Sequence, residues 1–460
     1  MKIKQFEVAG LAQYSYVLSS EGEAIVIDPM RDFERYTKYA QEQDLTIRFV
    51  TETHIHADFV SGASALAEAS GAGLVLSSYV QEPYIYSMEH QALRDGDELR
   101  IGKLRLAALH TPGHTPEHLG FVLFDGGRDA SEPVAFFSGD FLFVGSLGRP
   151  DLLGEDAKQQ LANDLYGSLH ERIAFLPDGV QVYPGHGAGS LCGSGLSERA
   201  ESTLGYERRS QPLFKLNREA FVEEILNSVP AMPSYYPRMK QLNSKGASSV
   251  AVLPGSTPLS PAELAALLAD DAVTVIDFRR REAFGGAHIP GAINIGAGQH
   301  LSLWAGWMIS PERRLLLVND SGDDEEARRS LVRVGLDRVE GFLHKGMPAW
   351  IDAGMEFTRT TQLSVQEVAA NRPRATILDV RDNKEWMAGH IEGAVHISLG
   401  ELRTRMGDLP KQTSMVAVCG SGYRSSVAAS LLEAQGFVNV SSMDGGMTAW
   451  KQHRLPAVTP

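Results

Sequence analysis

Apolar residues in the C-terminal part of the chain form short continuous runs separated by amphipathic segments. The runs TVIDF (274–278) and LLLVN (315–319) are each followed by a helical pattern, and the same alternation returns with TILDV (376–380) and MVAVC (415–419). Short apolar runs that alternate with helices indicate buried parallel strands. We therefore predict two small parallel α/β domains in tandem.

The two predicted domains also share motifs at a domain-length spacing. An Asp-x-Arg pair with a later His and Gly occurs in both, at Asp277, Arg279, His288 and Gly291 and again at Asp379, Arg381, His390 and Gly393. The segment HKGMPAW, which ends at Trp350, corresponds to DGGMTAW, which ends at Trp450. A repeat of this length is typical of a duplicated domain rather than of a solenoid unit.

The N-terminal part has a different pattern, with many short β-like runs separated by helical segments and Gly-rich turns. Several of these runs end in His or Asp, among them EAIVIDP, RFVTETH, FFSGD and VQVYPGH. Functional groups at strand ends are a common way for an α/β scaffold to build a site. The stretch 230–258 has Pro, Ser and Gly with little periodicity, so we expect it to be a connection. We predict three domains, at 1–245, 246–357 and 358–460.

Composition and charge agree with this division and narrow the function. A chain of 460 residues is too long for one hydrophobic core. Its 43 Lys+Arg and 57 Asp+Glu give a net charge of −14, which argues against a nucleic-acid or membrane surface. The start MKIKQFEVAG lacks the apolar run of a signal peptide, so we expect a cytoplasmic protein. The cysteines Cys192 and Cys419 are too few for a disulfide framework.

Candidate metal ligands follow the apolar runs of the first domain. In THIHADF, two imidazoles and a carboxylate stand at alternate positions, and an extended backbone would place all three on one side. Imidazole nitrogen and carboxylate oxygen suit zinc or iron. His110 and His118 are expected to be structural or supporting. The candidates are His54, His56, Asp58, His114, Asp140 and His186.

The motif order HxHxD, GHTP, SGD and PGHG resembles the metallo-β-lactamase superfamily over residues 1–240. In two-metal members such as glyoxalase II, the resemblance assigns one metal to His54, His56, His114 and Asp140. It assigns the other to Asp58, the next residue, Asp140 and His186. The next residue is usually His but is Phe59 here, and a phenyl ring has no lone pair to donate. The resemblance therefore favours a single metal.

The persulfide dioxygenases are the branch of this superfamily that uses one iron. The resemblance implies one Fe(II) per chain on His54, His114 and Asp140, with His56, Asp58 and His186 nearby, and zinc as the alternative metal. Two His and one carboxylate leave coordination positions free for both substrate and O2. The implied reaction oxidises a thiol persulfide to sulfite and thiol.

Two further residues of this domain are candidates for contact with the substrate. Arg149, in GSLGRPDL, resembles a substrate-pocket arginine of the family and would pair with a carboxylate of the thiol carrier. A loop-bracing role is the alternative. Cys192, on the Gly-rich loop after His186, is expected to contact substrate or accept sulfur, and a buried loop thiol is the alternative.

The last domain carries a candidate nucleophile in a loop between the MVAV run and a helical pattern. The loop is Cys419, Gly420, Ser421, Gly422, Tyr423 and Arg424. Backbone N–H groups at a helix N-terminus favour an anion and lower a cysteine pKa, and Arg424 adds positive charge. The segment resembles rhodanese-type sulfurtransferases over residues 360–460, whose loop is shorter than that of Cys-based phosphatases. We predict sulfur transfer through Cys419 and Arg424, with the intervening residues contacting the substrate; phosphate hydrolysis and a structural thiol are the alternatives.

The corresponding loop of the preceding copy lacks these groups. Asn319 stands in place of the nucleophile and Asp324 in place of the arginine, and Asp320, Ser321 and Gly322 lie between them. The carboxylates at 323–326 would repel an anion. We predict that this domain is inactive and serves as a spacer, docking surface or oligomer contact.

The whole chain resembles bacterial persulfide dioxygenase–sulfurtransferase fusions of sulfide detoxification. The implied fold is a metallo-β-lactamase αββα sandwich followed by two rhodanese-type domains. The implied partners are a glutathione or coenzyme A persulfide, O2, and sulfite or thiosulfate, in a homo-oligomer without nucleic acid or membrane. The rival hypotheses are a zinc thioester hydrolase of glyoxalase II type and a non-catalytic sulfur carrier or sensor that uses only Cys419.

Overall fold

The computed structural model describes residues 1–250, 253–320, 323–371 and 374–460. The chain divides into one unit of Met1–Ala251 with Val332–Gly335 and a second unit of Val252–Leu331 with Leu336–Pro460. Residues 251–252 of the expected connection, and Ser321 and Gly322 of the expected inactive loop, lie outside the described residues. Among the helices that are described, none is long and apolar enough to cross a membrane.

The first unit contains two sheets of short, mostly buried strands. One has the order β1-β2-β3-β4-β5-β6, with β1 Lys2–Val8, β2 Gln13–Ser20, β3 Glu23–Ile27, β4 Thr46–Thr51, β5 Gly73–Ser77 and β6 Gln91–Leu93. The other has the order β14-β13-β10-β9-β8-β7, with β7 Glu98–Ile101, β8 Leu104–His110, β9 Leu119–Asp125, β10 Asp129–Gly139, β13 Gln181–Pro184 and β14 Ser202–Thr203. A small hairpin follows β10, formed by β11 Leu142–Phe143 and β12 Ser146–Leu147.

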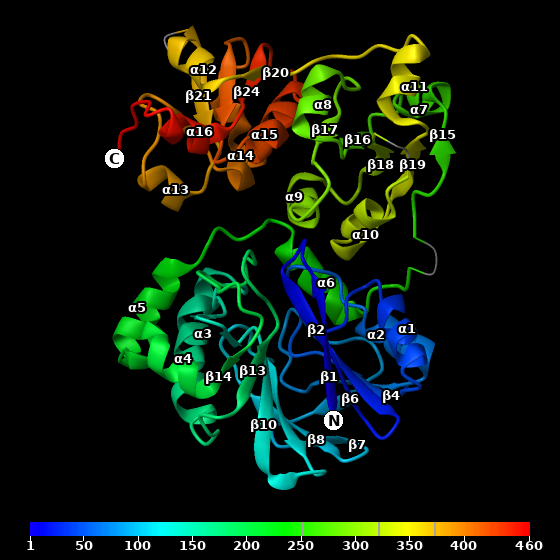
Figure 1. The fold of residues 1–460 in the computed structure, drawn as a ribbon, viewed down its shortest axis with the longest axis vertical. Helices are drawn as coiled ribbons and strands as arrows, with labels where there is room; N and C mark the ends of the chain where they lie inside the picture. The colour runs from blue at the N-terminus through cyan, green and yellow to red at the C-terminus, as the bar shows by residue number, and fades with distance from the viewer. Residues whose placement is uncertain (251–252, 321–322, 372–373) are drawn as a thin grey trace. The chain divides into compact units, whose positions relative to one another are not determined.

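The two sheets pack face to face, and helices cover their outer faces (Figure 1). Side chains of both inner faces share one apolar core, in which the rings of Tyr16 and Phe137 lie 5.0 Å apart. The outer faces pack against α1 Glu34–Glu42 and α2 Ala63–Ser70 on one side and against α3 Glu155–Gly167 and α5 Arg218–Ser228 on the other. The shorter elements are η1 Ser168–Arg172, α4 Leu204–Ser210 and η2 Pro212–Lys215. This arrangement confirms the predicted αββα sandwich.

The expected connection at 230–258 contains a helix, α6 Tyr236–Lys245, which the sequence pattern did not predict. Its residues Met239, Lys240 and Asn243 are buried against the first unit. The sequence YPRMKQLNSK has no strong apolar stripe, and such a helix is stabilised mainly by its tertiary contacts. The expected connection therefore includes a regular helix that packs within the first unit.

The second unit contains two parallel sheets with the same strand order within its described residues. The first has the order β15-β19-β18-β16-β17, with β15 Pro258–Leu259, β16 Val273–Asp277, β17 Ile293–Asn294, β18 Arg314–Val318 and β19 Val339–Leu343. The second has the order β20-β24-β23-β21-β22, with β20 Thr361–Leu363, β21 Thr376–Asp379, β22 Val395–His396, β23 Met415–Val418 and β24 Val440–Met443. The shared order confirms two small parallel α/β domains.

The helices of the second unit also correspond in pairs. Those of the first copy are α7 Pro261–Leu267, α8 Arg281–Gly286, α9 Leu301–Met308, α10 Glu325–Arg333 and α11 Gly346–Asp352. Those of the second are α12 Val365–Asn371, α13 Asn383–Met387, α14 Leu399–Arg405 with η4 Met406–Asp408, α15 Tyr423–Ala434 and α16 Gly446–Gln452. Trp350 and Trp450, at matching places in α11 and α16, are buried in the two cores.

The Asp-x-Arg pair has the same geometry in both copies. Arg279 Nη2 donates to Asp277 Oδ2 at 2.6 Å and to the carbonyl of Ala287 at 2.7 Å. Arg381 Nη2 donates to Asp379 Oδ2 at 2.7 Å and to the carbonyl of Gly389, which corresponds to that of Ala287, at 2.9 Å. Because the pair is buried and is present in the copy that lacks a cysteine, its role is to hold the strand end and the following turn together.

Glu433 in α15 gives a prediction for the stability of the second unit. Its carboxylate accepts a hydrogen bond from Thr360 at 2.7 Å and lies 3.6 Å from His288 Nε2. Burial raises the pKa of Glu433 to about 7 and lowers that of His288 to about 4. The two shifts act in opposite directions on stability: the raised pKa of Glu433 makes the folded state hold a proton, and the lowered pKa of His288 makes it release one. Above the ordinary histidine pKa of about 6.5 only Glu433 still titrates, so there stability falls as pH rises towards 7.

Glu433→Gln should therefore stabilise the second unit at pH 8, by about 2 kcal/mol, because the amide keeps an acceptor for Thr360 without ionising. The apparent unfolding midpoint in urea, measured at pH 5 and pH 8, tests this. The gain should fall below about 1 kcal/mol at pH 5, because Glu433 is protonated in the folded state and pH 5 is close to its ordinary pKa of 4.5. An equal effect at both pH values would contradict the assignment of a raised pKa.

Candidate metal and sulfur-transfer sites

The loop that follows β4 carries the HxHxD motif and is held by α6. Asn243 Nδ2 donates to the carbonyls of His56 and Phe59, both at 2.8 Å. Lys240 Nζ donates to the carbonyl of Ile55 at 3.3 Å. These contacts fix the backbone between the candidate ligands. No motif marks these α6 residues, so the sequence could not reveal their role.

Three of the predicted residues converge at one point. His54 Nε2 and His114 Nε2 lie 3.9 and 3.5 Å from Asp140 Oδ2, and all three residues are buried. These same three atoms have no hydrogen-bond partner among the described residues. Ligands bonded to one ion at ~2.1 Å are themselves separated by about 3–4 Å. Buried polar atoms without partners are rare, and here they stand at the separation that a shared metal ion requires.

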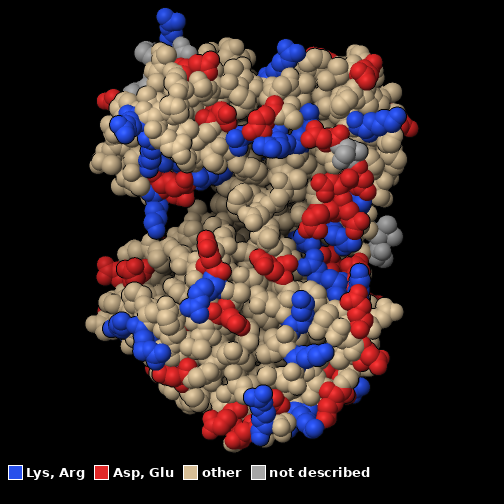
Figure 2. Space-filling model, in the orientation of Figure 1, with Lys and Arg blue, Asp and Glu red and all other residues tan. Residues whose placement is uncertain are grey.

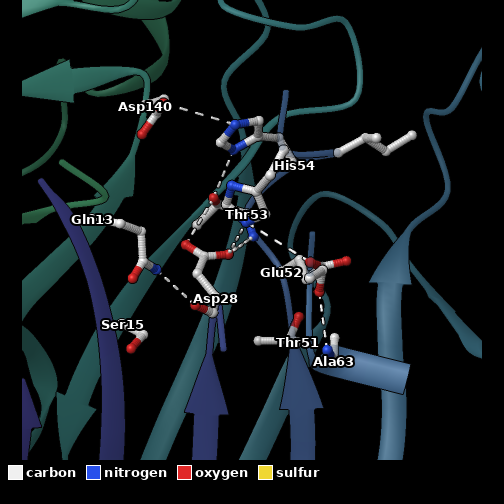
Figure 3. Close-up of polar contacts among 12 residues, drawn as sticks. Gln13, Ser15, Asp28, Thr51, Glu52, Thr53, His54, Ala63 and Asp140 are labelled. Carbon is white, nitrogen blue, oxygen red and sulfur yellow. Dashed lines mark hydrogen bonds and ion pairs between the residues drawn. The ribbon is translucent and has the colours of Figure 1, made fainter. Parts of the chain in front are cut away.

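The hydrogen bond at Nδ1 of His54 determines which of the two ring nitrogens carries the free lone pair. Thr53 Oγ1 donates its one proton to Asp28 Oδ2 at 3.0 Å, so it accepts from His54 Nδ1 at 2.9 Å. The lone pair of His54 then lies on Nε2, which faces Asp140. Figure 3 shows this chain from Asp28 through Thr53 to His54, with Gln13 holding the backbone of Asp28. Asp28 ends β3, and the sequence reasoning did not assign it a role.

His114 is oriented in the same way by a backbone group. Its Nδ1 lies 2.9 Å from the carbonyl oxygen of Arg149, which can only accept, so Nδ1 carries the proton and Nε2 the lone pair. Burial lowers the pKa of both His54 and His114 well below the usual value. Two neutral imidazoles with aimed lone pairs and one carboxylate form a set that suits a divalent transition metal.

His186 has a different environment, between two carboxylates. Its Nδ1 contacts Asp140 Oδ1 at 2.7 Å and its Nε2 contacts Asp58 Oδ2 at 2.9 Å. Burial opposes the charged form, yet Asp140 and Asp58 raise the pKa of His186 well above its usual value. His186 thus orients Asp140. Asp58, His186 and Cys192 form a second group of potential ligand atoms within 4.8 Å of one another.

His56 is outside the group of three converging ligand atoms, and Phe59 offers no ligand atom. His56 Nε2 lies 3.1 Å from Asp28 Oδ1, its Nδ1 has no hydrogen-bond partner among the described residues, and its ring centroid lies 4.4 Å from that of Phe59. The segment after β4 bends rather than continuing as a strand. The premise of an extended backbone therefore does not hold for this segment, although the rings of His54 and His56 lie 4.3 Å apart.

Arg149 makes contacts that join its own loop to two other segments of the chain. Its guanidinium forms a bidentate pair with Asp151 at 2.7 and 2.8 Å and donates to the carbonyls of Leu191 and Pro230. Its side chain is 0% exposed. These are the contacts of a loop brace, the alternative that the sequence left open. A substrate role for Arg149 stays a prediction.

Cys192 lies beside the candidate metal ligands. It is buried, and burial with the nearby Asp58 and Asp140 raises the pKa of its thiol well above the ordinary value. The thiol is therefore protonated at neutral pH in this arrangement. Its part in catalysis stays a prediction.

The Cys419 loop joins β23 to α15, as the pattern predicted. Gly422 donates its N–H to Cys419 Sγ at 3.1 Å, and Ser425 Oγ lies 3.6 Å from the sulfur. Gly446 has a φ of +54°, and a Cβ there would lie 2.3 Å from the Cys419 carbonyl oxygen, so only glycine lets α16 approach the loop. Gly422, at φ +108°, makes the turn into the helix.

Arg424 is paired with a carboxylate that the sequence reasoning did not consider. Its Nη1 and Nη2 donate to the two oxygens of Glu385 at 2.6 and 2.8 Å. Burial opposes ionisation of Glu385, but Arg424 lowers its pKa below the usual range. The pair holds Arg424 in place and offsets much of its charge.

The loop of the preceding copy is built for helix capping. Asp324 accepts from the N–H of Ala327 at 3.0 Å, and Asp323 pairs with Arg328 at 2.8 and 2.9 Å. Asn319 stands where the nucleophile stands in the second copy.

On the face shown in Figure 2, acidic and basic side chains are intermixed over the described part of the chain.

Comparison with known families matches both parts of the chain. Residues 8–186 match the metallo-beta-lactamase superfamily, and residues 260–353 and 364–453 each match the rhodanese-like domain. The chain is 35% identical to a metallo-beta-lactamase from Staphylococcus aureus of known crystal structure, with a TM-score of 0.68. That match covers 75% of this chain and 98% of the other.

Characterised relatives of the first part include two kinds of enzyme. The chain is 31% identical to the persulfide dioxygenase ETHE1, mitochondrial, of Bos taurus, over 46% of this chain and 74% of the relative. It is 28% identical to the hydroxyacylglutathione hydrolase GloC of Haemophilus influenzae, over 43% of this chain and 90% of the relative.

Proposed function

Because this chain belongs to the metallo-β-lactamase superfamily and joins a domain related to persulfide dioxygenase ETHE1 to two rhodanese-like domains, we propose that it oxidises a thiol persulfide and transfers sulfane sulfur. The first activity uses one Fe(II) on His54, His114 and Asp140. The second uses Cys419. The persulfide is carried by a low-molecular-weight thiol of the glutathione or coenzyme A type.

The convergence of three unpartnered ligand atoms is the observation that carries the dioxygenase proposal. His54 Nε2, His114 Nε2 and Asp140 Oδ2 are aimed at one point, and Thr53, the Arg149 carbonyl and His186 hold their other polar atoms. When bound there, Fe(II) supplies the redox chemistry that activates O2. The protein residues fix the ligand geometry and keep the site dry.

The overall oxidation balances with one water. A persulfide RSSH, O2 and H2O give the thiol RSH, sulfite and two protons, so that the outer sulfur is oxidised and O2 is reduced. Asp140 is held by His186 at 2.7 Å and so keeps its orientation while substrate enters.

The sulfur-transfer proposal rests on the Cys419 loop. The Cys419 thiolate attacks the outer sulfur of a donor such as thiosulfate, the S–S bond of the donor breaks, and sulfite leaves with the bonding electron pair. The N–H of Gly422, 3.1 Å from Sγ, favours the anionic sulfur. The persulfide on Cys419 then passes its outer sulfur to an acceptor thiolate. Because the first reaction makes sulfite and the second uses or releases it, the two fit together in one chain.

A zinc thioester hydrolase is the rival function. The similarity to hydroxyacylglutathione hydrolase GloC supports this alternative. Such enzymes of this superfamily use two metals. Asp58, His186 and Cys192 offer a second group of potential ligand atoms within 4.8 Å of one another. Against a second metal there, Phe59 offers no ligand and both nitrogens of His186 contact carboxylates.

Metal content and oxygen uptake separate the two functions. We expect about one iron per chain in protein purified without oxygen, with O2 consumption and sulfite release on addition of glutathione persulfide. Two zinc ions per chain, hydrolysis of a glutathione thioester and no O2 uptake would instead establish the hydrolase.

A further inference from the structure

The loop that begins at Cys419 is bordered by residues of the preceding rhodanese-like domain. Tyr423 donates a hydrogen bond to the carbonyl of Gly296 at 3.0 Å. One turn along α15, Ser426 donates to Asn294 Oδ1 at 2.7 Å. The loop and the start of α15 therefore rest against the end of β17 in the first copy, within the same unit.

Arg281, the first residue of α8, brings a guanidinium to this border. A Cβ on Gly422 would lie 3.0 Å from Arg281 Nε, so the guanidinium lies against the glycine that contacts the Cys419 sulfur. Arg281 Nη2 lies 3.1 Å from Asp444 Oδ1 and 3.1 Å from Glu282 Oε1. Its Nε is buried without a hydrogen-bond partner among the described residues, and the side chain is 30% exposed.

The loop's own arginine supplies little net charge, since both oxygens of Glu385 hold Arg424. A donor such as thiosulfate carries two negative charges and presents oxygen atoms that accept N–H donors. Binding it at a loop whose arginine is offset requires a further cation nearby. Arg281 is such a cation: Asp444 and Glu282 offset part of its charge as well, but its Nε N–H borders the loop and has no acceptor among the described residues.

A cavity of about 370 Å³ connects Arg281 and Tyr423 to the loop of the first copy. Its lining also includes Asn319 and the carboxylates of Asp320 and Asp324. The space admits a small oxyanion. The carboxylates oppose an anion while Arg281 attracts it, so their balance sets the affinity.

We propose that Arg281, from the domain without a nucleophile, is a specificity-determining residue that binds the oxyanion of the sulfur donor of Cys419. The proposal rests on the sulfurtransferase function proposed above. As the Cys419 thiolate attacks the outer sulfur of thiosulfate, Arg281 binds the oxygens of the group that leaves as sulfite. The inactive domain thereby forms one wall of the active site.

The test compares Arg281→Ala, Arg281→Lys and the control Arg403→Ala in sulfur transfer from thiosulfate to glutathione. Arg281→Ala should raise the KM for thiosulfate about tenfold with little change in kcat, because a hydrogen bond to a charged group is lost. Arg281→Lys should recover part of the loss. Arg403, an exposed arginine of α14 that does not line the cavity, should leave KM unchanged when it is replaced by alanine. Asp320→Asn should lower KM, because it removes a repelling charge.

A donor without an oxyanion separates binding from folding. With cysteamine persulfide as donor, Arg281→Ala should match the wild type. Equal losses with both donors, or equal KM values for Arg281→Ala and Arg403→Ala, would overturn the role of Arg281. If the wild type transfers no sulfur from either donor, or if Cys419→Ser transfers it equally well, the proposed sulfurtransferase function itself fails.

Discussion

Asp140→Ala should leave the protein without bound iron and without oxygen uptake, while sulfur transfer through Cys419 continues. Asp140 Oδ2 is the carboxylate atom shared by the two free imidazole nitrogens, and its loss removes the charged ligand of the set. We expect metal affinity to fall at least ~100-fold, more than for loss of a supporting contact. Iron content by mass spectrometry, O2 consumption with glutathione persulfide, and thiosulfate-dependent transfer are measured on one preparation.

Asp58→Asn is the matched control. Asp58 is also buried and contacts His186, but its oxygens are not aimed at the point shared by His54 and His114. This variant should keep about one iron per chain, with at most about a tenfold loss of affinity. If Asp140→Ala kept its iron, the ligand assignment would be wrong. Loss of one of two metals from Asp58→Asn would point to the two-metal hydrolase.

Cys419→Ser should abolish sulfur transfer and leave oxygen uptake with added persulfide unchanged. A serine hydroxyl is not ionised near neutral pH and cannot form a stable persulfide, so we expect a loss of at least ~1,000-fold. Oxygen uptake should persist because the iron ligands belong to another domain. Mass spectrometry after incubation with thiosulfate should find one added sulfur on Cys419 of the wild type and none on the variant.

Cys192→Ser is the control for thiol chemistry, because it leaves Cys419 as the one cysteine of the chain. It should retain sulfur transfer. Loss of both activities in Cys419→Ser would mean that the two sites act as one, which would contradict their assignment to independent domains.

Much of the fold could be predicted because its elements have strong local patterns. The apolar runs TVIDF and TILDV, with their shared motifs, indicate the duplicated parallel domains from the sequence alone. The helix α6 could not be predicted in this way, because its register depends on Asn243 and Lys240 meeting backbone carbonyls of a distant loop. Local periodicity carries no information about such partners.

The candidate site was predicted in its residue types but not in its orientations. Motif order identified His54, His114 and Asp140, and Phe59 indicated a single metal. Spacing did not reveal that His56 turns to Asp28, because this depends on how the chain bends after β4. Nor did it reveal Glu385, which lies far along the chain from Arg424 and meets it only after folding.

The matching Asp-x-Arg pairs have a consequence for reading genomes. Asp277 with Arg279 and Asp379 with Arg381 hold the same turns in a domain with a nucleophile and in one without it. Any survey that counts active enzymes by these signatures will therefore count this chain twice for one reaction. The residue that follows the fourth strand of each domain tells the two apart: it is Asn319 in the first copy and Cys419 in the second. Active domains should be counted by a cysteine at this position.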